Sequence, residues 1–577
     1  MRSAPTLVRS AALALLPVLA TCTAYPAKPG AGGDRDDGAT VETRRFLSGY
    51  ETEVARLDRL ANLASWQAAI TGREEDYAAS AEAALAYRKY HSDAAAWRRL
   101  RAWLQTADGL SELERRTLVL AEMEYHRNQL APERLERMVT LSKEIERALA
   151  TFRGELDGRR LSNNDLIERL RNEDSSARRE AAWKALKSVG GAVAPKLVEL
   201  ARLRNEAARD LGFSDFWDME IRLQEHDPRQ LLAVFDEMDR LTRGPFAEAK
   251  AEIDRHLAGR FGIAAADLMP WHYDNPFFQD APPSAEVDLD TFFQGRTREE
   301  IVERARVFFR DAGLPVDDIL RRSDLYEREG KDQGGFCTDI DRAGDVRILC
   351  NVKQNAEWME VTLHELGHAV YDLHLDPRLP YPVRTPAHAL TTEGAAMLFG
   401  ALVKDPAWLV ARAGADPARV GRVAKAIREQ RRREQLVFAR WSLVMLHFEK
   451  ALYEDPGQDL GARWWEIVAR FQLLRPPAGR REPDWASKPH FTISPVYYHN
   501  YLLGELFAAQ VRHVLGGLAK PPVPPSELRL DGDPAYGEFL RRKVFRPGAT
   551  WPWPEFVRRT TGEPLTPRHF AAEVSGR

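Results

Sequence analysis

A helical period dominates the pattern of apolar and polar positions along the chain. From about residue 41, apolar side chains recur every three or four positions within stretches rich in Ala, Leu, Glu and Arg, as in amphipathic helices. Proline and glycine punctuate the joins between these stretches, where they tend to interrupt helices. We predict helices over residues 41–104, 110–157, 163–212, 228–261, 297–312, 391–404, 417–453, 461–473 and 495–516, and a further one from about residue 356.

One region departs from this period. Gly334–Ile340 and Asp345–Val352 have the pattern of two short strands, and Asp341–Gly344 supplies a turn between them. Cys337 and Cys350 lie nearly equidistant from that turn, so we expect them to face each other across a hairpin. The predicted fold class is therefore mostly α, with one small β-hairpin.

The N-terminus has the features of an export signal. Arg2 and Arg9 precede an apolar run, Ala11–Ala20, which is long enough for a signal-peptide core and too short to span a bilayer. The run ends in a segment that resembles a bacterial lipobox, in which Cys22 would become the acylated first residue. Thr21 departs from the small residue usual before that cysteine. Ordinary cleavage nearby is the alternative, and either outcome predicts a periplasmic or membrane-anchored protein.

Composition and cysteine count fit this organisation. We assign residues 1–22 to the signal, the Gly-, Asp-, Pro- and Ala-rich residues 23–40 to a flexible tether, and residues 41–577 to a single unit, since no linker-like stretch divides them. A net charge of −3 without a long basic run argues against a nucleic-acid partner. If Cys22 is removed or lipidated, the other two of the three cysteines remain. An oxidising compartment would favour a disulfide between them, and two buried thiols are the alternative.

The clearest chemical signal is the H-E-x-x-H sequence at positions 364–368. His364 and His368 are four residues apart, so on a helix both imidazoles can reach one metal ion, and Glu365 can approach a metal-bound water as general base. A solvated helix face is the alternative. A metal site is favoured because the motif lies opposite an apolar stripe, which consists of Met359, Leu363, Leu366, Val370 and Leu373.

A third metal ligand is available in Glu393, which lies early in the next predicted helix. Taken alone, this residue would be interpreted as an exposed helix position. Two histidines and one glutamate leave the fourth position of a tetrahedral zinc ion open for water, which is the arrangement of a catalytic zinc site rather than a structural one.

These motifs resemble the angiotensin-converting-enzyme family of zinc peptidases and, more distantly, the thimet oligopeptidase and oligoendopeptidase family. Both have H-E-x-x-H followed by a glutamate ligand about 25 residues later, and 25 positions separate His368 from Glu393. Cys337 and Cys350 match a cysteine pair that precedes the zinc helix. The resemblance implies a large helical zincin with a substrate cleft and the small hairpin beside the H-E-x-x-H helix.

A second group of residues supports the first of these families. Its members have a Lys-x-His and a Tyr-x-x-Tyr where this chain has Lys488-Pro489-His490 and Tyr498–Tyr501. By that resemblance, Tyr501 and His490 would stabilise the tetrahedral intermediate, while Lys488 and Tyr498 would bind the C-terminal carboxylate of the substrate. Without the resemblance, the tyrosines could be core aromatics and Lys488 an exposed side chain.

The chain also departs from the converting enzymes at several positions. Asn500 replaces an arginine that helps to hold chloride, and Thr338 replaces a substrate-contacting histidine. A glutamine of their carboxylate pocket aligns weakly with Tyr273, and Met397 stands four positions after the glutamate ligand, where they have a supporting acid. Zinc binding and hydrolysis are compatible with these changes, whereas chloride dependence and strict dipeptide release do not follow.

The sequence therefore predicts an exported, monomeric metallopeptidase that binds one Zn²⁺ per chain and acts on oligopeptides, with dipeptides released from a free C-terminus. We expect contact with a membrane only through a lipid anchor at Cys22. A thimet-type oligoendopeptidase is the near alternative. A catalytically silent peptide-binding lipoprotein is the alternative from another class, and the retained Glu365 argues against it.

Overall fold

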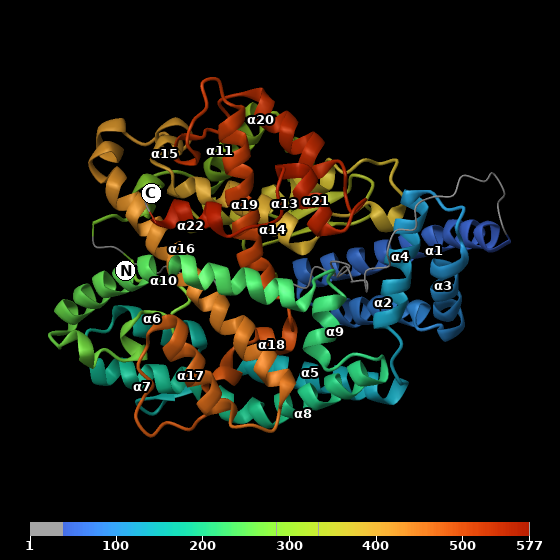
Figure 1. Cartoon of the computed structure of the whole chain (residues 1–577). Helices are drawn as coiled ribbons and strands as arrows, with labels where there is room; N and C mark the ends of the chain where they lie inside the picture. Colours follow the sequence, from blue (N-terminus) through green and yellow to red (C-terminus); the bar gives the residue numbers. More distant parts are fainter. Residues whose placement is uncertain (1–37, 284–285, 333, 576–577) are drawn as a thin grey trace.

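Helices make up most of the chain in the computed structural model, which describes residues 38–283, 286–332 and 334–575 (Figure 1). The first helices are α1 (Gly38–Thr71), α2 (Glu74–His91), α3 (Ala94–Thr106), α4 (Glu112–Arg127), α5 (Pro132–Thr151), α6 (Asn163–Asn172), α7 (Ser176–Lys187), α8 (Val189–Asp210), α9 (Phe216–Arg222) and α10 (Pro228–Phe261). The middle of the chain forms α11 (Arg298–Asp311), α12 (Asp317–Arg322), α13 (Ala356–Leu373), α14 (Ala389–Gly400) and α15 (Pro406–Ala411). The last helices are α16 (Pro417–Glu454), α17 (Leu460–Gln472), α18 (His490–Ile493), α19 (His499–Leu518), α20 (Pro534–Phe539), α21 (Trp553–Thr561) and α22 (Arg568–Ser575).

Shorter elements connect these helices. The 3₁₀ segments are η1 (Ala265–Asp267), η2 (Pro270–His272), η3 (Leu289–Phe292), η4 (Tyr381–Val383), η5 (Ala401–Lys404), η6 (Asp484–Ser487) and η7 (Pro525–Glu527), and η8 (Leu540–Phe545) is a π-helical turn. The strands of the described residues form two antiparallel pairs, β1 (Gly154–Leu156) with β2 (Arg159–Leu161) and β3 (Phe336–Asp339) with β4 (Val346–Leu349). The mostly α prediction, with a hairpin before the H-E-x-x-H helix, is confirmed.

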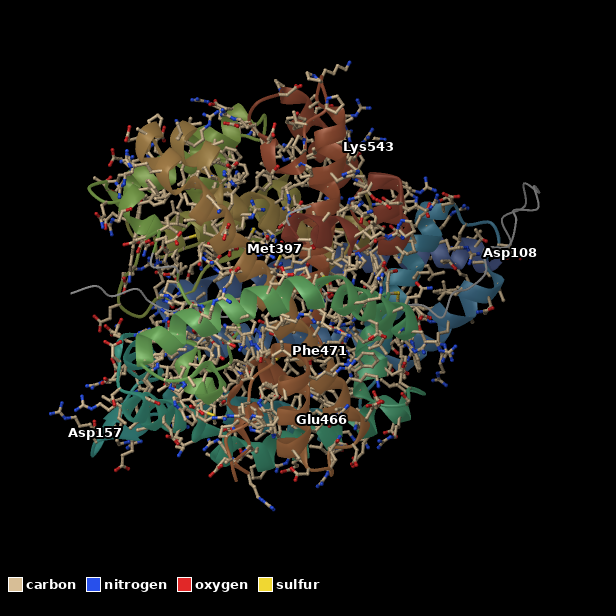
Figure 2. All side chains as sticks on the ribbon, turned by 60° about the vertical axis from the view of Figure 1, so that its left-hand side comes forward. Asp108, Asp157, Met397, Glu466, Phe471 and Lys543 are labelled. Carbon is tan, nitrogen blue, oxygen red and sulfur yellow. The ribbon has the colours of Figure 1, made fainter. Side chains whose placement is uncertain are left out.

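The predicted helical stretches 41–104, 110–157 and 163–212 each divide into shorter helices in the structure, because turn residues interrupt them. The stretch 41–104 divides into α1, α2 and α3; one break falls at Gly72, which has φ +66°, and another at Asp93, whose side chain caps α3. The stretch 110–157 ends in the unpredicted β1–β2 hairpin. Asp157 and Gly158, both with positive φ, form its turn, and Asp-Gly is a common hairpin signal. Figure 2 shows Asp157 at the edge of the molecule.

The helices α13, α14 and α19 pack side by side in the middle of the molecule, whereas α1 to α4 gather at one end (Figure 1). A single large apolar core includes the faces of the three central helices. The N-terminal helices enclose a smaller, separate core, which includes Leu47, Tyr50, Leu100, Trp103 and Tyr125. Met397 belongs to the large core, and Figure 2 places it toward the middle of the molecule.

The β3–β4 hairpin forms where the sequence predicts it, but its register contradicts the predicted disulfide. Cys337 pairs with Ile348, so Cys350 lies two positions further along, diagonal to Cys337. The Cα atoms of diagonal neighbours are about 7–8 Å apart, which exceeds the Cα separation of about 4.4–6.8 Å in disulfides. The two cysteines are free thiols, with the Cys337 Sγ 3.8 Å from a carboxylate oxygen of Asp372.

Candidate active site

The helix α13 carries the H-E-x-x-H motif and is fixed by a cap and by its apolar stripe. The Asn355 side chain accepts a hydrogen bond from the amide of Trp358 and begins the helix. As predicted, the stripe faces the core, with Met359, Leu363, Leu366 and Val370 fully buried. His364 and His368 lie on another face and are only partly buried, which leaves their rings accessible to a ligand.

Glycines bring α14 and α19 close to this helix. A Cβ atom on Gly367, inside the motif, would lie 2.7 Å from the Cα of Ala396 on α14, a distance that real side chains do not adopt. On the other side of α14, a Cβ on Gly394 would lie 2.8 Å from the carbonyl oxygen of Gly504 on α19, and one on Gly504 would lie 2.9 Å from the Cβ of Glu393. Backbone contact between these three helices therefore sets the position of Glu393.

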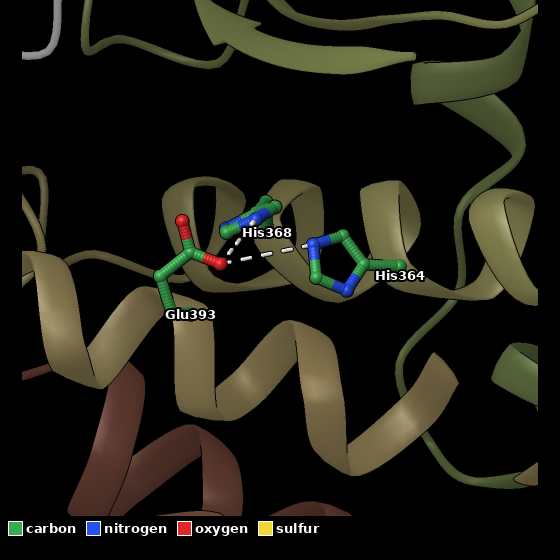
Figure 3. Close-up of side chains that lie close together, drawn as sticks. All are labelled: His364, His368 and Glu393. Carbon is green, nitrogen blue, oxygen red and sulfur yellow. Dashed lines mark ion pairs between the residues drawn. The ribbon is translucent and has the colours of Figure 1, made fainter. Parts of the chain in front are cut away.

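The predicted metal ligands converge at this point. Glu393 Oε2 lies 3.8 Å from His364 Nε2 and 3.9 Å from His368 Nε2 (Figure 3). One ligand atom from each of the three residues falls within 4.8 Å of the others, and no second group of this kind occurs among the described residues. Tetrahedral zinc with bonds of about 2.1 Å places its ligand atoms roughly 3.4 Å apart. The donor set therefore fits zinc after small side-chain movements.

Two further side chains orient these ligands, and the sequence analysis did not identify either. Thr392 Oγ1 lies 2.7 Å from His368 Nδ1, which leaves the Nε2 atom of that ring directed toward Glu393. The Tyr497 hydroxyl donates a 3.0 Å hydrogen bond to Glu393 Oε1. Burial lowers the pKa of His368 to about 4, so at neutral pH its ring is uncharged and has a lone pair to offer a metal.

Glu365 lies on α13 between the two histidines and is buried beneath the start of the β3–β4 hairpin. A Cβ on Gly335 would lie 3.6 Å from Glu365 Oε1 and 2.7 Å from Val361 Cγ1, so the absence of a side chain at position 335 lets the backbone pass close to the carboxylate. The chain therefore holds Glu365 against backbone, next to the predicted metal ligand His364, where a general base for water would be needed.

The late tyrosine and histidine residues form one aromatic group next to Glu393. The ring centroid of Tyr501 lies 5.4 Å from that of Tyr497 and 5.2 Å from that of Tyr498, and the His490 centroid lies 5.0 Å from that of Tyr498. Because the Tyr497 hydroxyl contacts Glu393, this group borders the metal ligands. The structure thus brings the predicted residues Tyr501, Tyr498 and His490 together at the site.

Lys488 and Tyr498 lie side by side, as the carboxylate-clamp prediction requires. Lys488 Nζ is 5.5 Å from the Tyr498 ring centroid and donates a 2.6 Å hydrogen bond to Gln279 Oε1. The Tyr498 hydroxyl accepts a 2.7 Å hydrogen bond from the indole of Trp441. Gln279, rather than the weakly aligned Tyr273, is therefore the polar partner of Lys488; the Tyr273 hydroxyl instead donates to Asp254.

Export and lipidation are not addressed by these contacts, because the predicted signal, the tether residues before position 38 and Cys22 lie outside the described residues. The helices that the structure does describe include none with the length and apolar character needed to cross a membrane.

Comparison with known proteins adds an independent line of evidence. The family model described as "Angiotensin-converting enzyme" (Peptidase_M2) matches residues 38–567. The chain is similar to the angiotensin-converting enzyme of Mesocricetus auratus, with 23% identity over 414 residues, and to that of Theromyzon tessulatum, with 22% identity over 412 residues. Each alignment covers 66% of this chain, 31% of the first relative and 65% of the second. The chain therefore matches less than a third of the mammalian protein's length.

Proposed function

Because this chain belongs to the angiotensin-converting-enzyme family of peptidases, we propose that it is a zinc metallopeptidase that hydrolyses oligopeptides and releases dipeptides from a free C-terminus. The observation that carries the proposal is the convergence of His364, His368 and Glu393 within 4.8 Å beside the buried carboxylate of Glu365. These three residues would hold one zinc ion per chain. When bound, zinc supplies Lewis-acid activation of water and of the peptide carbonyl.

The protein's own groups would complete the reaction. Glu365 would accept a proton from the attacking water and deliver it to the leaving amine, which then departs neutral. Tyr501 and His490 would donate hydrogen bonds to the oxyanion as negative charge develops on the carbonyl oxygen. Tyr498 and Tyr497 contact Tyr501 through their rings, which supports a fixed orientation for this donor before the substrate binds.

The carboxylate clamp would determine where the peptide is cut. Lys488 supplies a positive charge, and Tyr498 and Gln279 supply polar groups beside it, so a free C-terminal carboxylate would be held at a fixed position relative to the zinc ligands. Asn500 donates to Gln224 and carries no charge, so we expect no strong activation by chloride. We also propose that the protein is exported, with or without a lipid on Cys22, and this part of the proposal rests only on the N-terminal sequence.

Two variants test the catalytic proposal. Glu365→Gln should keep one zinc per chain, measured by metal analysis, and lose about 10²–10⁴-fold in the rate of peptide hydrolysis, because it removes the base but no ligand. Glu360→Gln is the matched control on the same helix, since Glu360 is paired with Lys404. A Glu365→Gln protein with full activity would refute the mechanism, and a wild-type protein that binds peptide without cutting it would favour the silent binding protein.

Product analysis tests the specificity. Mass spectrometry of products from a mixed peptide library should show dipeptides from free C-termini, and C-terminal amidation should raise KM sharply, because it removes the charge that Lys488 would bind. Equal hydrolysis of amidated and free peptides would argue against a carboxylate clamp and would favour the thimet-type oligoendopeptidase.

A further inference from the structure

The turn that precedes α19 is strained and clamped. Val496 has φ +52°, which is an outlier for a β-branched residue and costs free energy unless the surroundings enforce it. Its amide donates a 2.7 Å hydrogen bond to Glu449 Oε1 and its carbonyl oxygen accepts a 2.8 Å hydrogen bond from Gln224 Nε2. Both partners are buried, so two side chains from distant parts of the chain hold the backbone on both sides of Val496 in place.

The residue that follows the clamped turn contacts a predicted metal ligand. Tyr497 directs its hydroxyl at Glu393 Oε1, 3.0 Å away, while Glu393 Oε2 faces the Nε2 atoms of His364 and His368. The two oxygens of one carboxylate thus have different partners. The last torsion of a glutamate side chain is broad and only weakly confined by its own rotamer preferences, so a hydrogen bond to one oxygen, such as that from Tyr497, helps to distinguish it from the other.

We propose that Tyr497 is a positioning residue that holds Glu393 in a one-oxygen orientation, with Oε2 reserved for zinc, and that the clamped turn at Val496 exists to aim it. The inference rests on the proposed zinc site. Removal of the hydroxyl would let the carboxylate rotate about its last torsion, so that either oxygen, or both, could approach the ion. The tyrosine would therefore influence the affinity and geometry of the metal site without touching the metal.

The test is Tyr497→Phe, which removes one oxygen and keeps the ring that packs against Tyr501. Zinc affinity of the metal-free protein, measured by competition with a chelator, should fall about tenfold, the lower end of the usual range for outer-shell partners of a metal ligand. The visible spectrum of the Co²⁺-substituted protein should also change, because it reports ligand geometry. A merely structural role would leave that spectrum unaltered.

The matched control is Tyr381→Phe. Tyr381 is also buried and also donates to a carboxylate, Asp58, at 2.7 Å, but it contacts no predicted metal ligand. The Tyr381→Phe protein should bind zinc and Co²⁺ as the wild type does. A Tyr497→Phe protein with wild-type zinc affinity and an unchanged Co²⁺ spectrum would overturn the positioning role alone. A wild-type protein that takes up no zinc would overturn the proposed function and this inference with it.

Discussion

The central helix α14 and the N-terminal helix α2 are packed in opposite ways. Every residue of α14 from Leu390 to Gly400 is buried, and glycines bring its backbone into contact with α13 and α19. In α2 the only buried residue is His91, and Leu85 is 58% exposed. The close approach at Gly504 means that a single added methyl group there would press on Glu393, a predicted metal ligand.

The helix α1 contacts the β3–β4 region through both apolar packing and polar contacts. Trp66 of α1 packs with Ile340 and Leu349, and the absence of a side chain at Gly72 lets the backbone approach the Gly330 carbonyl oxygen. Asn62 of α1 donates to the carbonyl oxygen of Asp339 on β3, and Arg342 of the adjoining turn forms a 2.8 Å ion pair with Asp58. Because α2 contributes one buried residue whereas α14 is buried from Leu390 to Gly400, we expect sequence changes in α2 to be tolerated and changes in α14 to be damaging. Each prediction below tests this difference.

Acidification should give the largest effect, and it should act on the central region. His388 caps α14 and His499 begins α19, and burial lowers the pKa of each to about 3. An unfolded histidine has a pKa of about 6.5, so the unfolded chain binds more protons and stability falls as the pH drops from about 6.5 toward 3. At pH 5 each histidine should lower the unfolding free energy by about 2 kcal/mol relative to pH 8, measured by urea denaturation.

The control for this prediction is the variant His499→Gln. Its unfolding free energy should fall less between pH 8 and pH 5 than that of the wild type, because only His388 of this pair still contributes. Hydrogen exchange resolved by peptide can show where the acid-induced loss begins. Early exchange in α1 and α2, with α14 and α19 still protected, would show that the N-terminal helices are more sensitive to acid than the central ones.

A methyl group at the contact between α14 and α19 should give the next largest effect. In Gly504→Ala the added Cβ would lie 2.9 Å from the Cβ of Glu393, so the helices must separate or the ligand must move. We expect a loss of about 1–3 kcal/mol in unfolding free energy together with weaker zinc binding, measured by urea denaturation and chelator competition.

A glycine-to-alanine substitution near the other end of α19 should stabilise the protein instead. A Cβ on Gly517 would meet nothing within 4 Å, so Gly517→Ala should stabilise the protein by about 0.4–1 kcal/mol, because alanine restricts the unfolded chain more than glycine does. Equal effects of the two substitutions would show that the close approach at Gly504 has no energetic importance.

Loss of the threonine that orients His368 should have a smaller and more local effect. Thr392→Val keeps the shape of the side chain but removes the oxygen 2.7 Å from His368 Nδ1. Zinc affinity should fall about tenfold, equivalent to about 1.4 kcal/mol, with little change in the melting temperature. Thr392→Ser restores the hydroxyl and should recover most of the affinity; failure to do so would argue against the hydrogen bond as the cause.

The smallest effect is expected on α2. Leu85→Ser replaces a side chain that is more than half exposed, so the unfolding free energy should change by no more than about 0.5 kcal/mol, and zinc affinity should be unchanged. A loss comparable to that of Gly504→Ala would mean that another surface covers α2 in the folded protein.

The sequence predicts the convergence of His364, His368 and Glu393 because much of the pattern is local. The two histidines lie four residues apart, one helical turn, whereas Glu393 is singled out by its spacing after this motif and by the resemblance to a peptidase family. Gln279 could not be found in this way, since it lies 209 positions from Lys488 and no periodic pattern links them. The contact of Thr392 with His368 could not be predicted either, although the two residues are close in sequence, because it depends on how α14 is rotated against α13.

Small errors of position explain two other failures. Cys337 lies four residues before the turn at Asp341–Gly344, and Cys350 lies six residues after it. That difference of two positions is enough to make the cysteines diagonal neighbours. The strand β1 lies within the predicted helical stretch 110–157, and β2 lies just after it, although Asp157-Gly158 between them is a hairpin turn signal.

The spacing of the site residues along the chain has a consequence for how the protein acquires its activity. His364 and Glu393 belong to the neighbouring helices α13 and α14 and lie 29 positions apart, whereas Tyr497 reaches Glu393 across 104 positions. Short loops close at a lower entropic cost than long ones, and long-range contacts tend to form later. We therefore expect the nascent chain to be able to capture its metal before it has the surface that holds a substrate, so that a partly folded protein would bind zinc without cutting peptides.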